Sequence, residues 1–450
     1  MKISRFTLLT SAISTLGTYG AMQLARLMSG IIMARLLTPD LLGIMLIVYV
    51  LRYSAEQLSD IGIGQSIVSN SNAEKEEFFN TAWSLQLIRG ILLTIAFLAA
   101  VIPLSYVYDT PIFTSILPIV SLYFVLAGFT SMSLFLLARR MQIIRLNIFE
   151  LCVEIISAVA RVGIVYIYPT IWGLVFGSFV QPIARLFGSH FIASDVRHKF
   201  YVSKDYAWQI FDFGKWIFFS AVLFFLSSNF DRLYLGKVLP FALLGIFGIA
   251  RNLSGTVAEG IVRVCRIVVF PLIATSSEHP LENVREEVAP VRLGFLILAA
   301  IGVSVFVAVS DILISILYDA RYQEAGWMLP VLSVGLWFST LSSVNEWTLI
   351  GIGRAQYSSF ANGLKFAWIL VALPLATIRF GMLGTVFAVA LSDLFRYFPI
   401  LLGQIRFRLS FAGQDLVSTL TFIALIVLWE WLRAVLGLGT SFSHVPFSML

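Results

Sequence analysis

The sequence predicts an all-α membrane protein with two pseudo-symmetric six-helix lobes around a central cleft and about one extra C-terminal helix. Composition supports this class: of 450 residues, 59% are hydrophobic and 12% are charged. The mean hydropathy is +0.90. Soluble domains contain about a quarter charged residues. A weak internal similarity between the two halves of the chain supports the division into lobes.

The helices follow from apolar segments of roughly 20 residues, the length that spans a bilayer. The basic start MKISRF leads into an apolar run that is too long for the core of a signal peptide, so we expect a retained first helix. We place about 13 helices at residues 7–33, 41–66, 82–107, 112–138, 146–168, 171–193, 209–235, 240–268, 291–317, 326–350, 357–378, 381–403 and 415–437.

An internal repeat relates the two halves. RLLTPDLLGI (35–44) resembles KVLPFALLGI (237–246), LPIV (117–120) resembles LPVL (329–332), and WGLVF (172–176) resembles LGTVF (383–387). The three matches keep their order and recur at separations of roughly 200 to 210 residues. We therefore predict lobes over residues 1–200 and 201–405, joined by the polar stretch SDVRHKFYVSKDY, and an additional segment over 406–450. Duplicated lobes are typical of transporters.

Loop charges predict the orientation. With the N-terminus in the cytoplasm, the outer loops carry only Arg35, Lys237, Arg321 and Arg379, and the inner loops carry roughly three times as many basic residues. The sequence therefore predicts a multi-pass membrane protein with its N-terminus in the cytoplasm.

Several classes of protein are disfavoured. The net charge of +6 is spread over the loops of a membrane protein and does not indicate nucleic-acid binding. The four histidines and two cysteines show no metal-ligand spacing. No phosphate-binding GxxxxGK[ST] motif occurs, so energy would come from an ion gradient, the membrane potential or the substrate gradient. The predicted first outer loop is only LLTPD. This argues against a membrane glycosyltransferase, since such enzymes usually carry acidic residues in a larger first outer loop.

One stripe of charges lies inside an apolar segment. In IMLIVYVLRYSAEQLSDIGIG (44–64), Arg52, Glu56 and Asp60 are each four residues apart, so they share one helix face. Arg52 lies about 18 Å from the outer end at roughly 1.5 Å per residue, near the bilayer centre. A buried arginine is costly there and should face a wet cavity or the bundle interior. The alternative is an Arg52–Glu56 pair that neutralises itself.

Three more cations lie at similar depth: Arg26, Lys215 and Arg251. We expect these three to lack a counter-ion on their own helix, and all four to line a cationic cavity. The arginine fork suits phosphate oxygens, so such a cavity would bind an anionic or phosphorylated substrate. The alternative is that carboxylates on other helices satisfy these cations, which then only hold the bundle together.

Other charged residues are candidates for gating or ion coupling. Most form acid–base sets at helical spacing, for which structural pairing is the alternative role. Glu259 or Asp311 could carry a coupling proton or sodium ion. The gating or coupling candidates are Asp40, Glu56, Asp60, Glu154, Arg161, Glu259, Arg263, Asp393 and Arg396, with Glu150, Glu346 and Lys365 nearby.

Several stretches resemble, in order, the polysaccharide transporter family, the Wzx-like oligosaccharide flippases. They include RLLTPDLLGIMLIV with LSDIGIGQSIV, ARRMQIIRLNIFELCVEI, FDFGKWIFFS, LYDARYQEAGWMLPVL and GRAQYSSFANGLKF. The resemblance extends to about residue 405. It implies two six-helix lobes around a central cleft, in the superfamily that includes multidrug and toxin extrusion proteins. It also implies movement of a polyprenyl-diphosphate-linked oligosaccharide to the outer leaflet.

The resemblance further implies residue roles. Related lipid II flippases use cavity arginines, and Arg26, Arg52 and Arg251 resemble them, while Asp40 resembles a functional acid. The lipid II branch has more helices than this chain, which counts against lipid II as substrate. We expect a flippase rather than an enzyme, with no cofactor beyond proton or sodium coupling, and with a polymerase and glycosyltransferases of the same pathway as partners. An ion-coupled multidrug exporter of the same fold and a membrane glycosyltransferase are the alternatives.

Overall fold

A computed structural model describes residues 5–192, 197–276 and 281–446, and every regular element in these ranges is helical. The chain divides into two compact units. Unit 1 is Met1–Phe225 with Gly236–Ala242, and unit 2 is Leu226–Leu235 with Leu243–Leu450. The division falls within the ninth helix, whereas the predicted lobes meet at residue 200, before this helix begins.

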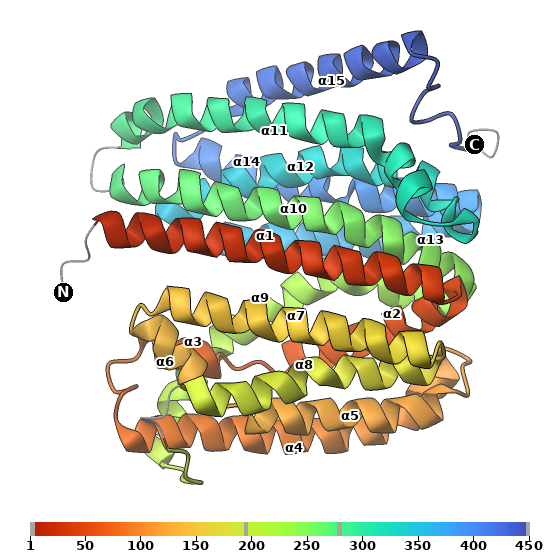
Figure 1. Ribbon diagram of the computed structural model, residues 1–450. Helices are drawn as coiled ribbons and strands as arrows, with labels where there is room; N and C mark the ends of the chain where they lie inside the picture. Colours follow the sequence, from red (N-terminus) through yellow and green to blue (C-terminus); the bar gives the residue numbers. More distant parts are fainter. Residues whose placement is uncertain (1–4, 193–196, 277–280, 447–450) are drawn as a thin grey trace. The chain divides into compact units, whose positions relative to one another are not determined.

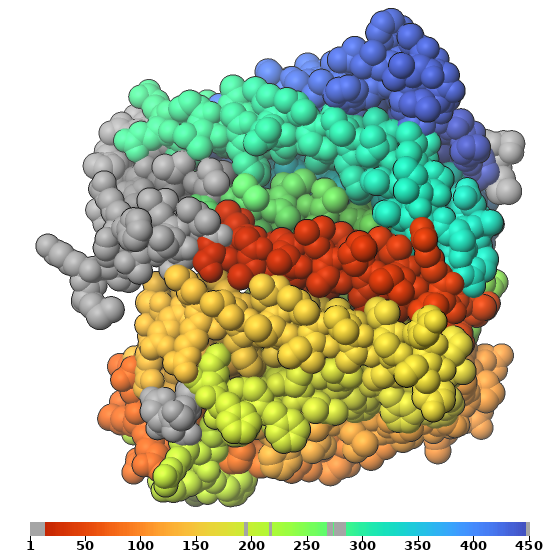
Figure 2. Space-filling model, viewed as in Figure 1, coloured from red at the N-terminus to blue at the C-terminus, as the bar shows by residue number. Residues whose placement is uncertain are grey.

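Unit 1 is a bundle of helices formed by the first half of the chain (Figure 1). Within it, α4 packs along α5, and α7 packs along both α1 and α8. Figure 2 shows α1, α7 and α8 as adjacent bands on one face of this unit. The helices are α1 (Arg5–Leu36), α2 (Pro39–Gln57), α3 (Ile63–Ser69), α4 (Glu76–Val107), α5 (Phe113–Phe129), α6 (Ser133–Arg139), α7 (Ile143–Ile167), α8 (Ile171–Ile192) and the first part of α9 (Lys204–Val238).

Unit 2 contains Leu226–Leu235 of α9 and the helices that follow, from Leu243 onward. Its core surrounds the buried Trp337 of α12, which stacks on Phe422 of α15 with ring centroids 4.8 Å apart. α12 packs against α11, α13 and α14, and α15 packs along α11. The elements are α10 (Phe241–Ser276), α11 (Leu281–Leu317), the 3-10 helix η1 (Ala320–Tyr322), α12 (Ala325–Gly351), α13 (Gln356–Ala390), α14 (Ser392–Arg406) and α15 (Ala412–Val435).

The surface is that of a membrane protein. α4 exposes Leu92, Ile95 and Ile102, which lie on one apolar helix face. Seven helices in the described ranges are long and apolar enough to cross a membrane, or up to nine if each of two bent pairs is one span. The chain is therefore a multi-pass membrane protein. Each predicted segment overlaps helical structure, but α1, α2 and α7 are not among the seven, so the predicted count of spans stays a prediction.

Two predicted continuous helices are broken. The segment 41–66 ends as α2 at Gln57 and resumes as α3 after Gly62, whose φ of 66° is left-handed. The Gly62 N–H donates to the Asp60 carboxylate at 3.0 Å within this break. The segment 112–138 bends by 49° between α5 and α6. Arg139 at the end of α6 donates to the Val68 carbonyl at 3.0 Å, at the end of α3, so the two short helices support each other.

Helix boundaries agree with the internal repeat. α1 ends at Leu36 and α2 begins at Pro39, while α9 ends at Val238 and α10 begins at Phe241, so both boundaries occur at matching positions of the first repeated stretch. Pro118 and Pro330 each lie inside a helix, five residues after its first residue. The two halves therefore match in the positions of these helix boundaries as well as in sequence.

The predicted boundary between segments 357–378 and 381–403 is a reversal inside α13. Gly381 has φ 59° and ψ −138°, which is not helical. The Thr377 and Thr385 hydroxyls lie 2.8 Å apart across the turn, and Trp368 donates to the Ala388 carbonyl at 2.9 Å. These bonds tie the arms of a tight hairpin, and the turn needs a residue without a Cβ.

Gly381→Ala is expected to destabilise unit 2 by about 1–3 kcal/mol, because this backbone conformation is accessible essentially to glycine alone. Gly363→Ala is the matched control: it lies in the same helix with open space around its Cα, where alanine should be neutral or stabilise by up to about 1 kcal/mol. Unfolding of both variants in detergent micelles measures the difference. Equal unfolding midpoints would contradict the assigned strain.

The predicted joint between the lobes, 194–206, is described from residue 197 onward; residues 194–196 lie outside the described ranges. Its backbone N–H groups at Lys199, Tyr201 and Ser203 donate to buried side chains of α4. The acceptors are Asn80 at 3.0 Å, Ser84 at 2.9 Å and Thr81 at 3.1 Å. The joint is therefore fixed along unit 1 rather than a free linker.

His198 in this joint makes the stability of unit 1 depend on pH. Burial and the neighbouring His190 ring lower the pKa of His198 to about 4, against about 6.5 in an unfolded chain. The unfolded chain thus binds more protons between these values, so stability is lost as the pH falls from about 6.5 towards 4. His198→Asn should flatten this part of the thermal-unfolding profile in detergent. An unchanged slope would show that His198 does not contribute.

Candidate functional site

Of the four cations predicted to line the cavity, Arg26 and Lys215 lie in unit 1 and have acidic partners. The Arg26 guanidinium lies 2.8 Å from the Glu154 carboxylate of α7, although its own side chain is 50% exposed. Lys215 Nζ lies 2.6 Å from the carboxylate of Asp212, three residues earlier on the same face of α9. The prediction that these cations lack a counter-ion on their own helix is therefore wrong for Lys215, whereas Arg26 is paired with an acid of another helix. For Lys215 the acid was present in the sequence at helical spacing.

The cation predicted in unit 2 is also paired. Arg251 Nε of α10 lies 3.3 Å from the buried Asp231 carboxylate of α9. Asp231 is an acid inside an apolar segment, and this position in the sequence could have indicated that it pairs with a buried cation. The expectation of an uncompensated Arg251 is wrong, and the alternative of a carboxylate on a neighbouring helix describes Arg26 and Arg251.

Arg52 differs from the other three. No carboxylate in the described part of the chain forms an ion pair with it. Its guanidinium carbon instead lies 3.8 Å from the centre of the Tyr123 ring, and its buried Nε has no hydrogen-bond partner there. The Arg52–Glu56 pair that the spacing suggested is not made. A half-buried arginine stacked on an aromatic face is held in place by the ring, and its Nε stays unbonded.

Two arginines that the sequence reasoning did not single out complete this site. Arg89 of α4 and Arg185 of α8 are, with Arg52, close enough to act electrostatically on the Glu56 carboxylate. We call Arg52, Arg89 and Arg185 the unit 1 arginine cluster. Arg185 is bridged to Glu150 at 2.6 Å. Arg89 donates to the Ser59 hydroxyl at 3.0 Å and to the backbone carbonyl of Glu56 at 2.5 Å.

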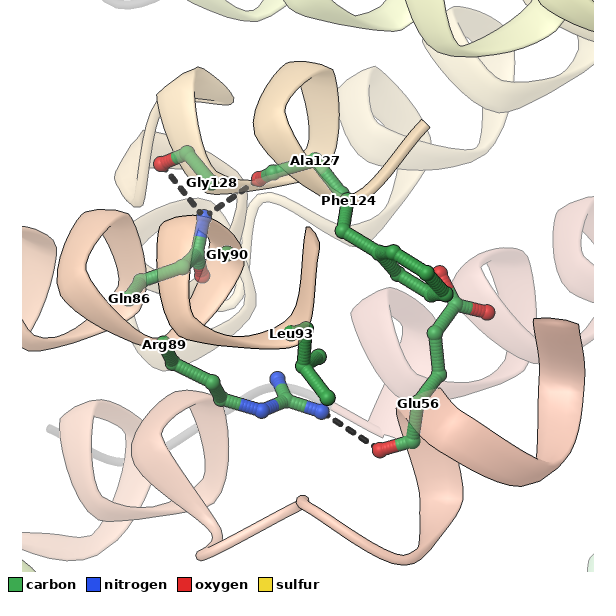
Figure 3. A pocket seen from close by; sticks show the side chains of 8 residues that line it. All are labelled: Glu56, Gln86, Arg89, Gly90, Leu93, Phe124, Ala127 and Gly128. Carbon is green, nitrogen blue, oxygen red and sulfur yellow. Dashed lines mark hydrogen bonds between the residues drawn. The ribbon is translucent and has the colours of Figure 1, made fainter. Parts of the chain in front are cut away.

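A small cavity of about 110 Å³ adjoins the cluster (Figure 3). Glu56, Gln86 and Arg89 supply its polar lining, and Leu93 and Phe124 supply much of the apolar part. Figure 3 shows Arg89 bonded to the backbone of Glu56 while the Glu56 carboxylate points elsewhere, towards Phe124. Its volume is enough for a few water molecules.

The remaining gating candidates of unit 1 have structural contacts of their own. Asp40 is exposed in the first turn of α2, where a negative charge favours the helix dipole. Asp60 accepts from the backbone in the α2–α3 break, and Glu154 bridges α7 to α1. Arg161 packs its side chain against Gly177 of α8. None of these contacts tests a gating role.

In unit 2, the predicted sets combine into one buried network. Lys365 Nζ lies 2.8 Å from the Asp393 carboxylate, and Arg396 is paired with Glu346 and lies 3.9 Å from Asp393. Arg251 is near enough to act electrostatically on Lys365 and Asp393. These residues thus form the structural pairs that were one of their two expected roles; the other role, gating, stays a prediction. Glu259 and Arg263 lie one turn apart on α10.

A second buried network, which sequence reasoning missed, attaches α15. Arg292 of α11 is fully buried and paired with Asp415 at the start of α15. Asp415 also accepts from Asn345 at 2.9 Å and from the Tyr397 hydroxyl at 2.8 Å. At the other end, Asp311 forms two bonds of 2.8 and 2.7 Å with Arg433, so it is not the unpaired acid that the sequence suggested.

Metal binding finds no support in the part of the chain that the structure describes, which contains no group of three or more His, Cys, Asp or Glu side chains able to hold a metal ion.

Sequence comparison identifies a family. The profile described as "Polysaccharide biosynthesis protein" matches residues 32–325. A curated relative, the lipopolysaccharide biosynthesis protein WzxC of Escherichia coli (strain K12), is 21% identical over 324 residues, which are 70% of this chain and 63% of that protein. The match thus spans less than two thirds of the relative's length.

Solved structures share the fold. An inward-facing multidrug resistance MATE family transporter of the MOP superfamily aligns with a TM-score of 0.66 at 15% identity, covering 88% of this chain and 98% of that one. The lipid II flippase MurJ in an inward closed conformation aligns with a TM-score of 0.66 at 12% identity, covering 95% and 99%. A MOP superfamily transporter from Pyrococcus furiosus aligns with a TM-score of 0.61 at 15% identity, covering 89% and 95%. At these identities the likeness concerns the fold.

Proposed function

Because the chain belongs to the polysaccharide biosynthesis protein family, we propose that it is a flippase that moves a polyprenyl-diphosphate-linked oligosaccharide across the membrane. The resemblance to Wzx-like flippases points to the same cargo class. Its binding surface would be exposed alternately to the two sides of the bilayer, for exopolysaccharide or O-antigen synthesis. No step of this cycle requires bond chemistry by the protein, so we propose a transporter and not an enzyme.

The observation that carries the proposal is the unit 1 arginine cluster. Arg52 of α2 is half-buried and keeps an unbonded Nε, and Arg89 and Arg185 add positive charge near it. Keeping such a charge partly buried without a carboxylate partner costs free energy, which a bound anion would offset. A diphosphate accepts several guanidinium donors at once. Arg26 and Lys215 of the same unit would join the site after exchanging their present carboxylate partners for phosphate oxygens.

Location and partners follow from the same proposal. The loop charges favour a cytoplasmic N-terminus in the bacterial inner membrane, which would place the diphosphate pick-up on the side where the lipid-linked sugar is assembled. Polymerase and glycosyltransferases of the pathway would supply and consume the cargo. No organic cofactor is needed, and a proton or sodium gradient would drive the cycle.

The second candidate is an ion-coupled multidrug exporter, favoured by the fold shared with a MATE family transporter. Organic cations require an acidic cavity lined by aromatic groups, whereas Arg52, Arg89 and Arg185 surround a single unbridged Glu56. The charge at this site therefore favours an anionic cargo.

Proteoliposomes test the choice directly. A fluorescent polyprenyl-diphosphate oligosaccharide is placed in one leaflet, and a membrane-impermeant glycosidase reports its arrival in the other. Reconstituted protein should accelerate the transfer above that of protein-free vesicles. Unaccelerated transfer combined with export of a cationic dye would favour the multidrug alternative.

A further inference from the structure

The spacing of Arg52 and Glu56 in the sequence permits an ion pair, but the two side chains do not form one in the structure. Arg52 and Glu56 are four residues apart on α2, a spacing that suits a salt bridge. Arg52 lies over Tyr123 instead, at 3.8 Å. The Glu56 side chain lines the small cavity and forms no ion pair among the described residues. The two charges thus interact electrostatically without forming an ion pair.

The charges that face Glu56 come from each helix packed around it. α2 supplies Arg52, α4 supplies Arg89 and α8 supplies Arg185, while α5 places the Tyr123 ring there. Of the nearby acids, Glu150 is occupied by Arg185, and Asp60 acts on Arg89. In the described part of the chain, Glu56 and Asp60 thus act on the cluster without an ion pair to one arginine, and Asp60 already accepts from the Gly62 N–H at 3.0 Å.

The polar lining of the cavity does not neutralise this carboxylate either. The Gln86 amide donates to the carbonyls of Ala127 at 2.8 Å and Thr130 at 3.1 Å. Arg89 directs its donors to Ser59 and to the backbone of Glu56. The space that remains has room for water beside the carboxylate, which provides a source and an acceptor for protons.

We propose that Glu56 is a proton-binding site linked to the anion site at Arg52, so that diphosphate binding is accompanied by proton uptake at Glu56. The inference rests on the proposed function. In the empty protein the Glu56 carboxylate lies near three positive charges. A bound diphosphate takes over their neutralisation and adds negative charge nearby. The carboxylate then accepts a proton from a cavity hydronium ion, which becomes water, and one O–H bond forms as one is broken.

This linkage is reciprocal, because a ligand that favours protonation of Glu56 must itself bind more tightly when Glu56 is protonated. The three arginines of the cluster and Glu56 have a net charge that changes when a proton or the diphosphate binds. The protein thereby lowers the net negative charge of the loaded site, which reduces the cost of holding a diphosphate in a membrane-spanning unit.

Calorimetry of the purified full-length chain in detergent tests the proposal, with farnesyl diphosphate as the probe. Titrations at pH 7.5 in two buffers of different ionisation enthalpy give the number of protons exchanged per ligand bound. Wild type should take up more protons than Glu56→Gln, with a difference approaching one. Glu150→Gln, the other glutamate beside the cluster, should keep the wild-type proton uptake.

The outcomes separate the two proposals. Diphosphate binding with equal proton exchange in wild type and Glu56→Gln overturns the linkage and leaves the flippase proposal standing. The linkage is also overturned if affinity depends on sodium, replaced by choline in a parallel titration, without any proton uptake. Absence of diphosphate binding in wild type overturns the proposed function, and the linkage with it.

Discussion

Arg52→Ala is expected to abolish transport of the lipid-linked oligosaccharide while leaving the chain folded and inserted. Hydrogen bonds from a charged donor contribute about 1.5–3 kcal/mol each, and about 1.4 kcal/mol is a tenfold change in affinity. Loss of this guanidinium should weaken diphosphate binding by about 10- to 100-fold. Folding should be little affected, because Arg52 has no carboxylate partner among the described residues that the change would leave unpaired. Leaflet transfer in proteoliposomes and calorimetric affinity measure the two effects.

Two controls make the Arg52 result specific. Arg52→Lys keeps the charge but loses the planar fork, so it should retain part of the affinity. Arg145→Ala removes an exposed arginine at the start of α7 and should transport as wild type. Full transport by the double variant Arg52→Ala, Arg251→Ala would refute the cation site altogether.

The sequence predicted the helices well because apolar length and period act locally. Segments such as 82–107 and 291–317 lie inside α4 and α11 as expected. It failed where a helix breaks without losing hydropathy, as between α2 and α3. There a left-handed Gly62 and the carboxylate of Asp60 stabilise a turn that a hydropathy window averages away.

The candidate site was less predictable because ion pairs between helices join residues far apart in the chain. Glu154 reaches Arg26 and Asp231 reaches Arg251 only after the bundle has formed. Depth along a helix identified buried cations, but it could not show which neighbour would satisfy them. Arg89 and Arg185 were visible in apolar segments, yet only packing shows that they surround Glu56.

The two units thus treat their buried cations differently. Unit 2 binds Arg251, Lys365 and Arg396 to specific carboxylates. Unit 1 pairs Arg26 and Arg185 with glutamates, but Arg52 forms no ion pair among the described residues. Buried pairs of the first kind fix packing, whereas an unbridged cation of the second kind has free donors for an anion. This contrast is why the proposed cargo site centres on unit 1.

Arg292→Ala should have the largest effect on stability in the molecule. The change would leave Asp415 buried without its cation, which costs about 3–5 kcal/mol. Since Asp415 joins α15 to α11, α12 and α14 through Arg292, Asn345 and Tyr397, we expect α15 to detach before the rest of unit 2 unfolds. Hydrogen exchange of α15 and thermal unfolding in detergent measure the loss.

The double variant Arg292→Met, Asp415→Leu separates charge burial from simple loss of contact. Replacing both members of a buried ion pair by apolar residues of similar size is often neutral or stabilising, so most of the loss seen in Arg292→Ala should be recovered. The second pair, Asp311–Arg433, and the Trp429 bond to Ser304 at 3.1 Å still hold the other part of α15 along α11. If the double variant is as unstable as Arg292→Ala, α15 depends on this network for its specific position and not only for the neutralisation of a charge.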